Sequence, residues 1–186
     1  MQRKGTYFAG RHIRLLPLIL ALLFGSFGCA TGKVSVDLTT YVNQGVMNIA
    51  ELEQKALAKY ASVTGKNYKN DEMVYQALQD DVIPLYRRFI RGLRAIQPQT
   101  EEVRVLHRIY IEGADSLLEG FKLVLLAIEK QDSSIIRPAN EYLETGLRDT
   151  ERWKKDLIAL SEKYGVKITG KQESGKSLLD TFLGGQ

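Results

Sequence analysis

Residues 170–177, GKQESGKS, match the phosphate-binding loop pattern G-x-x-x-x-G-K-[ST] at every fixed position. Such a loop binds phosphate because its backbone amides converge at a strand–loop–helix turn, and it needs a metal-binding acidic residue on another strand. Here the upstream sequence has helical periodicity, apart from a possible short strand VKIT at 166–169, and only nine residues follow Ser177. We therefore predict that GKQESGKS is a polar linker and that the protein binds no nucleotide.

Metal-binding residue types are few in this chain. His107 is the only histidine beyond the first 28 residues, and no Glu-x-x-His repeat of the kind that binds paired iron in helical bundles occurs. The acidic pairs Glu112/Asp115 and Glu141/Glu144 have the spacing of solvent-facing carboxylates on a helix. We expect no metal site.

Two further functional classes depend on His107. A haem held by this imidazole and by the sulfur of Met47 or Met73 is an alternative that the composition leaves open. No Ser/His/Asp set stands out as a local motif, and no cysteine is placed for catalysis. We expect no cofactor, and an envelope enzyme is the least favoured of the functions considered.

The N-terminal segment has the composition of an export signal. Four basic residues and no acidic residue occur in the first 28, and the apolar stretch LLPLILALLFGSFG has 14 residues, too few for an ordinary membrane-spanning helix. It ends in Ser26-Phe27-Gly28-Cys29, which resembles the signal of bacterial lipoproteins, although that class usually has Leu where Ser26 stands. The resemblance implies that residues 1–28 are removed and that Cys29 is lipidated.

Composition agrees with this reading. Cys29 is the only cysteine, so no intramolecular disulfide can form. The resemblance further implies a palmitate-type anchor, and Ala30 in place of Asp points to the outer membrane, facing the periplasm. The alternative is an ordinary secretory signal cleaved near Ala30.

Net charge argues against a nucleic-acid partner. The whole chain has 26 basic and 22 acidic residues, and four of the basic ones lie in the first 28, so residues 29–186 carry 26 − 4 = 22 of each sign. A neutral protein has no long-range field that attracts DNA or RNA.

The remaining sequence predicts an all-α protein. After a small-residue spacer at 29–35, four segments repeat apolar residues at helical spacing: 36–63, 70–96, 100–128 and 132–165. Pro84 should kink the second helix or divide it near Asp81. Short connections between long helices predict an antiparallel up-down-up-down four-helix bundle over 36–165, followed by a flexible tail at 166–186.

Two surface features are candidate interaction sites. Arginines on the second and third helices are spaced to share faces near the turn that joins them, where the lipid anchor also begins, so contact with anionic headgroups is one interpretation and local ion pairing is the other. These residues are Arg87, Arg91, Arg94, Arg104 and Arg108.

The tail carries a short apolar segment, formed by Leu178, Leu179, Phe182 and Leu183. Four large apolar side chains within six residues should either fold back on the bundle or dock on a partner. We expect a lipid-anchored envelope protein that acts as a structural or protein-interaction module, and the alternative is a bundle that binds a small ligand or cofactor.

Overall fold

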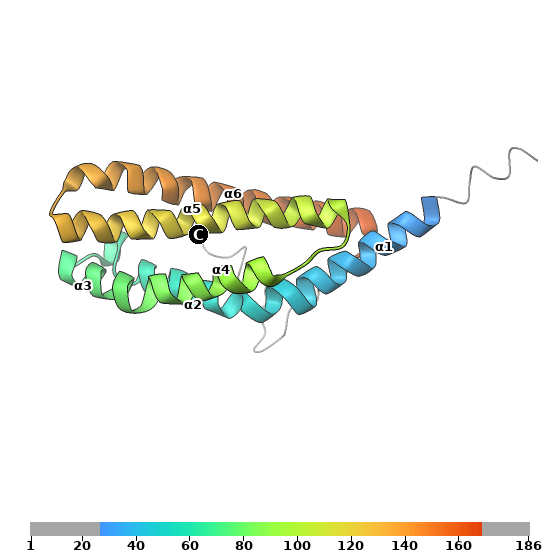
Figure 1. Ribbon diagram of the computed structural model, residues 1–186, viewed down its shortest axis with the longest axis horizontal. Coiled ribbons are helices and arrows are strands. Elements are labelled where there is room, and N and C mark those ends of the chain that lie inside the picture. The colour runs from blue at the N-terminus through green and yellow to red at the C-terminus, as the bar shows by residue number, and fades with distance from the viewer. Residues whose placement is uncertain (1–26, 169–186) are drawn as a thin grey trace, which may run out of the picture.

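A computed structural model describes residues 27–168, and within that range the protein is all-helical with no strand. The first rod comprises α1 (Phe27–Thr40), a π-helical turn (Tyr41–Val46) and α2 (Met47–Ala61), and the second comprises α3 (Asp71–Gln76), a π-helical turn (Ala77–Val82) and α4 (Ile83–Ala95). The third and fourth rods are α5 (Glu101–Lys130) and α6 (Ile136–Tyr164). Successive rods run in opposite directions, so the predicted up-down-up-down bundle is confirmed (Figure 1).

The N-terminal boundary differs from the prediction. Residues 29–35, expected to form a spacer, belong to α1, which begins at Phe27 and extends beyond the end of the bundle (Figure 1). The loop-like motif GKQESGKS and the apolar residues 178–183 lie outside the described residues. No helix within residues 27–168 is long and apolar enough to cross a membrane.

Local capping signals fix several helix ends. The Asn70 side chain accepts a hydrogen bond from the backbone N–H of Met73 at 2.9 Å and so caps α3. Gly165 ends α6 with a φ of 64°, a left-handed conformation that glycine adopts without strain. Both ends agree with the sequence prediction.

Pro84 is accommodated without a break in the second rod. It occupies the first turn of α4, directly after the π-helical turn Ala77–Val82. A proline has no N–H to donate and clashes with the preceding turn of a regular α-helix. We infer that the wider π turn absorbs this defect, so the rod continues through Asp81 instead of dividing there.

Three glycines bring α5 and α6 close together, and this pair makes the most extensive helix contact in the structure. A Cβ atom at Gly146 would lie 2.5 Å from Cγ of Leu117 and 2.7 Å from the carbonyl oxygen of Gly113. A Cβ atom at Gly120 would lie 2.6 Å from Leu143. Any side chain at these positions would force the helices apart.

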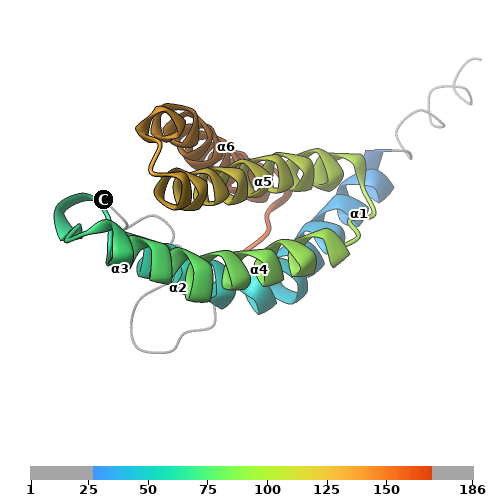
Figure 2. The same cartoon turned by 60° about the vertical axis from the view of Figure 1, so that its left-hand side comes forward.

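The bundle is not equally closed on all sides. Helix α2 packs on α4, and α1 touches both α5 and α6, whereas α2 and α6 barely touch each other. Figure 2 shows α6 beyond α5 at the top of the view and α2 beside α4 at the bottom, with a gap between α2 and α6. Two large apolar residues of α6, Tyr142 and Leu147, are exposed by 44% and 57%.

Candidate functional site

A buried carboxylate joins α1 to the turn between α4 and α5. Asp37 is 8% exposed, and its oxygens accept hydrogen bonds from the backbone N–H groups of Gln99 and Thr100 at 2.7–3.0 Å. The Thr100 hydroxyl donates to the same carboxylate at 2.6 Å. Thr100 is the residue preceding α5, as predicted, but it makes no side-chain cap of its own. Asp37, from a different helix, instead binds the two amides of the turn that leads into α5.

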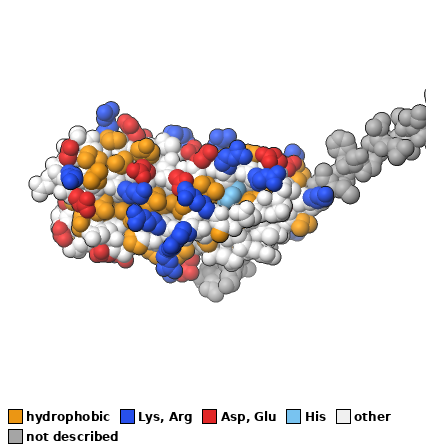
Figure 3. Space-filling model, in the orientation of Figure 1, with side chains coloured by type: hydrophobic (Ala, Val, Ile, Leu, Met, Phe, Trp, Pro, Cys, Tyr) orange, Lys and Arg blue, Asp and Glu red, His pale blue; other side chains and the backbone are white. Residues whose placement is uncertain are grey.

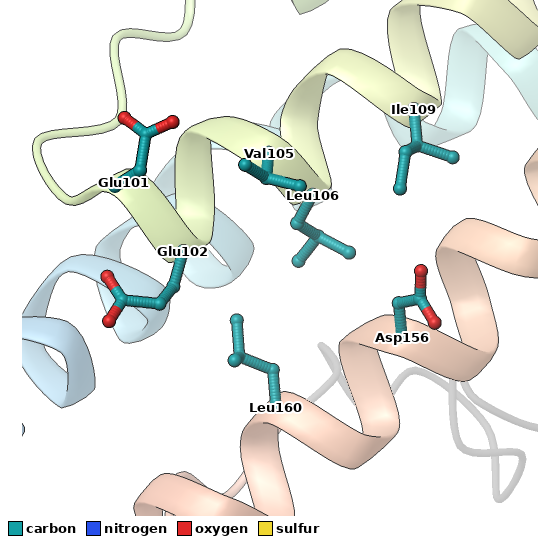
Figure 4. Close-up of a pocket in the computed structure, with 7 residues that line it drawn as sticks. All are labelled: Glu101, Glu102, Val105, Leu106, Ile109, Asp156 and Leu160. Atoms are coloured by element: carbon teal, nitrogen blue, oxygen red, sulfur yellow. The ribbon is translucent and has the colours of Figure 1, made fainter.

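An apolar groove lies between α5 and α6 at this same end of the bundle (Figure 4). It has a volume of about 460 Å³, and Val105, which lines it, is 45% exposed. The end of α6 is tied to the start of α5 by the hydroxyl of Tyr164, which donates to Glu102 at 3.4 Å. The groove is lined by four apolar and three acidic side chains: Val105, Leu106, Ile109, Leu160, Glu101, Glu102 and Asp156.

The predicted arginine cluster divides into paired and unpaired members. Arg94 donates to both carboxylate oxygens of Asp115 at 2.7 and 2.8 Å, which joins α4 to α5. Arg104 binds Glu101 at 3.0 Å, and Arg108 approaches the same carboxylate at 4.0 Å.

Arg87 and Arg91 differ from these three. They are exposed on the α5-facing edge of α4, and within residues 27–168 no acidic group lies within salt-bridge distance of either. Figure 3 shows basic side chains gathered over the face formed by α4 and α5. Within residues 27–168, Arg87 and Arg91 thus remain without the ion pairs that Arg94, Arg104 and Arg108 make.

A carboxylate that the sequence did not single out lies inside the core. Glu53 on α2 is 2% exposed, and the Tyr110 hydroxyl donates to it at 2.6 Å. Burial raises the pKa of Glu53 to about 7, although Tyr110 and the ammonium group of Lys154 partly oppose this rise. Tyr86 also faces the carboxylate without a well-formed hydrogen bond, and Oε1 of Glu53 has no partner among the described residues.

Aromatic rings surround this carboxylate. The ring of Tyr110 stacks on Trp153 with centroids 3.9 Å apart, and the indole N–H of Trp153 donates to the hydroxyl of Tyr41 at 3.2 Å. This packing holds Glu53 in place, and Glu53 lines none of the three openings described for residues 27–168.

His107 is packed against protein rings. Its imidazole meets the ring of Tyr41 edge-on, with centroids 5.5 Å apart, and burial lowers its pKa. Met73 opens α3 at the opposite end of the bundle and is 38% exposed, so the fold does not bring it to His107. Met47 packs against the apolar core instead of facing solvent. Tyr41 occupies one side of the imidazole.

Two other openings lie on the surface of residues 27–168. One, of about 330 Å³, lies between the first rod and the end of α4 and is lined by Asp37, Gln44 and Asn48 among others. The other, of about 440 Å³, opens at the far end of the bundle between Tyr60 on α2 and Ile136 on α6. Within residues 27–168 no three His, Cys, Asp or Glu side chains lie close enough together to hold a metal ion.

The comparisons with known proteins give no relative. No family model, no curated protein and no solved structure matches this chain. The structure places Cys29 at the start of α1. The buried carboxylates of Asp37 and Glu53 were not predicted from the sequence, because acidic residues within helical patterns ordinarily face solvent.

Proposed function

We propose that the protein is a lipid-anchored interaction module of the bacterial cell envelope. The observation that carries this proposal is the position of Cys29, the cysteine of the lipoprotein-like signal, in the first turns of α1. Asp37 follows it by only eight positions, a distance of about 12 Å along an α-helix. Because Asp37 is bonded to the turn before α5, a lipid on Cys29 would hold the bundle close to the bilayer in a fixed orientation.

The groove between α5 and α6 supports a role in binding another protein. It is open to the surface, lies at the anchored end, and combines an apolar floor with the carboxylates of Glu101, Glu102 and Asp156. Its charge and shape suit a peptide segment of an envelope protein that presents a large apolar side chain beside Lys or Arg. A basic residue on that segment would meet the rim at Glu102 and Asp156, beside their contacts with Tyr164 and Arg152.

A second candidate function, binding of a small ligand in the core, has one observation in its favour. The carboxylate of Glu53 and the hydroxyl of Tyr86 are buried polar groups without a full set of partners among the described residues. Such groups mark ligand sites when a cavity adjoins them. The described openings lie elsewhere, so the interaction module is the better supported function.

Lipidation can be tested in a Gram-negative host that expresses the full chain. A clickable palmitate analogue should label the parent protein and fail to label Cys29→Ala, which should shift to the soluble fraction or remain uncleaved. If Cys29→Ala is labelled and sediments as the parent does, the anchor is elsewhere and the proposal is wrong.

Partner binding is tested separately with a photo-crosslinking amino acid at Val105, and at Tyr68 as a control. Tyr68 is 53% exposed but lies at the far end of the bundle. We expect a discrete envelope-protein adduct at position 105 that Glu102→Lys together with Asp156→Lys removes. An adduct at both positions, unaffected by the charge reversal, would show that the groove has no specific partner.

A further inference from the structure

The facing sides of α2 and α6 leave an apolar surface without a helical partner, which we call the α2–α6 seam. On α2 it includes Leu57 and Tyr60, which are half-buried, and on α6 it includes Ile136 and Leu147. Leu147 lies 11 residues after Ile136, three helical turns along, and so shares its face. At 57% exposure Leu147 is among the most exposed large apolar residues described, and the far end of the seam opens into the 440 Å³ cavity.

A buried polar atom also faces this seam. Gln54 lies three residues before Leu57, on the side of α2 away from α4, because Ile49 and Lys59 mark the side that contacts the second rod. Its Nε2 atom is buried and has no hydrogen-bond partner among the described residues. A buried amide N–H that lacks an acceptor is costly, so this group favours an occupant with carbonyl oxygens.

The end of the described chain is directed back onto the bundle. After the left-handed turn at Gly165, the backbone N–H of Val166 donates to the carbonyl of Ser161 at 2.9 Å. Val166 and Ile168 are half-buried and pack against the core cluster, whereas Lys167 between them is exposed. The chain therefore leaves α6 along the protein surface in an alternating, extended manner instead of projecting into solvent.

The residues that follow are numerous enough to span the distance to the seam. Phe182 follows Ile168 by 14 residues, an extended reach of about 46 Å at 3.3 Å per residue. Leu147 lies 17 residues before the end of α6, about 26 Å along the helix. The intervening polar stretch GKQESGKS is long enough to bridge this distance with slack.

We propose that the apolar segment 178–183 of this same chain covers the α2–α6 seam. Its residues Leu178, Leu179, Phe182 and Leu183 would pack against the apolar side chains of Leu147 and Leu57. Its backbone carbonyl groups would accept a hydrogen bond from Gln54. The segment is thus held by its own bundle, and this surface is not available to an outside partner while it is covered. The inference does not depend on lipidation of Cys29 or on the groove between α5 and α6.

Paired cysteines test the contact in the full chain, purified in detergent, with Cys29→Ser so that only the introduced thiols remain. One variant carries Leu147→Cys with Phe182→Cys. The matched control carries Val105→Cys with Phe182→Cys, since Val105 is an exposed apolar residue of similar exposure in the other groove. We expect the first pair to form an intramolecular disulfide at least about tenfold faster than the control, because docking raises the effective concentration of the thiols.

Three other outcomes would overturn the proposal. Equal slow rates for both pairs would mean that the segment does not dock on the seam. A faster reaction with Val105→Cys would assign the segment to the α5–α6 groove. Disulfide-linked dimers that form faster than either intramolecular bond would mean that the segment binds a second copy of the chain. Both introduced sites are exposed or outside the described core, so loss of folding is not expected to obscure the comparison.

Discussion

Glu53 and Asp37 are two buried carboxylates with opposite surroundings. Asp37 accepts hydrogen bonds from two backbone amides and a hydroxyl, so its charge is compensated by fixed donors. Glu53 accepts one strong hydrogen bond, from Tyr110, and lies among rings. Asp37 therefore acts as a fixed acceptor for the turn before α5, whereas Glu53 should stabilise the fold when it is protonated.

Glu53 makes stability depend on pH. Because burial raises its pKa from 4.5 to about 7, the folded protein keeps a proton that the unfolded chain has released between these values. Its contribution to the free energy of unfolding should be complete below pH 4.5 and fall by about 3 kcal/mol as pH rises through 7. Glu53→Gln, which still accepts from Tyr110 but cannot ionise, should remove this fall in urea titrations at pH 5 and pH 8.

The control for this prediction is Glu51→Gln, two residues away on the same helix but exposed and paired with Lys55. It should keep the pH dependence of the parent. His107, whose pKa burial lowers, contributes stability that increases with pH through its usual range, and it does so equally in all three proteins. If Glu53→Gln and the parent lose the same stability between pH 5 and pH 8, Glu53 is already ionised in the folded state.

Asp37→Ala should detach α1 from the turn before α5. Two backbone amides and the Thr100 hydroxyl would lose their acceptor, which we expect to lower the free energy of unfolding by about 2–4 kcal/mol. Amide hydrogen exchange at Gln99 and Thr100 should accelerate. Asp132→Ala is the control, because Asp132 accepts from the N–H and hydroxyl of Ser134 at an exposed turn, and its loss should cost no more than about 1 kcal/mol.

The contact between α5 and α6 is set by small residues. Gly113 and Gly146 meet across the helix pair, so the two backbones approach closely, and the surrounding leucines pack around that point. Toward the start of α5, larger side chains such as Val105, Leu106 and Leu160 line the space between the same two helices, and the acidic-rimmed groove lies there. The groove and the glycine contact thus lie along the same pair of helices, α5 and α6.

Gly146→Ala should therefore destabilise the protein even though alanine favours helices more than glycine does. The added methyl group would overlap Leu117 and the Gly113 carbonyl, at an expected loss of about 1–3 kcal/mol in thermal or urea unfolding. Gly32→Ala on α1, where a Cβ atom would meet nothing within 4 Å, should be neutral or stabilising by up to about 1 kcal/mol. Equal effects of the two substitutions would contradict the close approach.

The molecule as a whole is neutral beyond residue 28, so attraction to an anionic surface has to come from local charge. Arg94, Arg104 and Arg108 are partly compensated by acidic neighbours. Arg87 and Arg91 are not compensated by any described residue, and they lie on the helix that ends beside the start of α5. They are the members of the predicted cluster best suited to bind headgroups.

Removing these two charges should weaken binding to vesicles that contain anionic lipid. In a Cys29→Ala background, where no lipid anchor contributes, Arg87→Ala with Arg91→Ala should reduce the partition constant roughly tenfold or more at low salt. Arg137→Ala with Arg152→Ala removes the same net charge from exposed, paired positions on α6 and should have little effect. If the two double variants bind equally weakly, the effect reflects net charge and not the α4 face.

The sequence alone determined the number, approximate limits and order of the four helices. The capping side chain of Asn70, the stop at Gly165 and the helical spacing of apolar residues act within a few residues of each other, so they can be read without knowledge of the fold. Up-down topology followed from the short connections between the rods. The helical start of α1 at Phe27 was missed, since Ala30, Gly32 and Ser35 carry no apolar periodicity.

Tertiary structure decided which polar residues became buried and which apolar residues stayed exposed. Asp37 meets Thr100 across 63 sequence positions, and Glu53 meets Tyr110 across 57, so no local pattern could identify either pair. Leu147 fits the apolar stripe of its helix but is exposed because α2 and α6 diverge. Helices form from local hydrogen bonds and periodicity, whereas the distance between two helices depends on every side chain packed between them, glycines included.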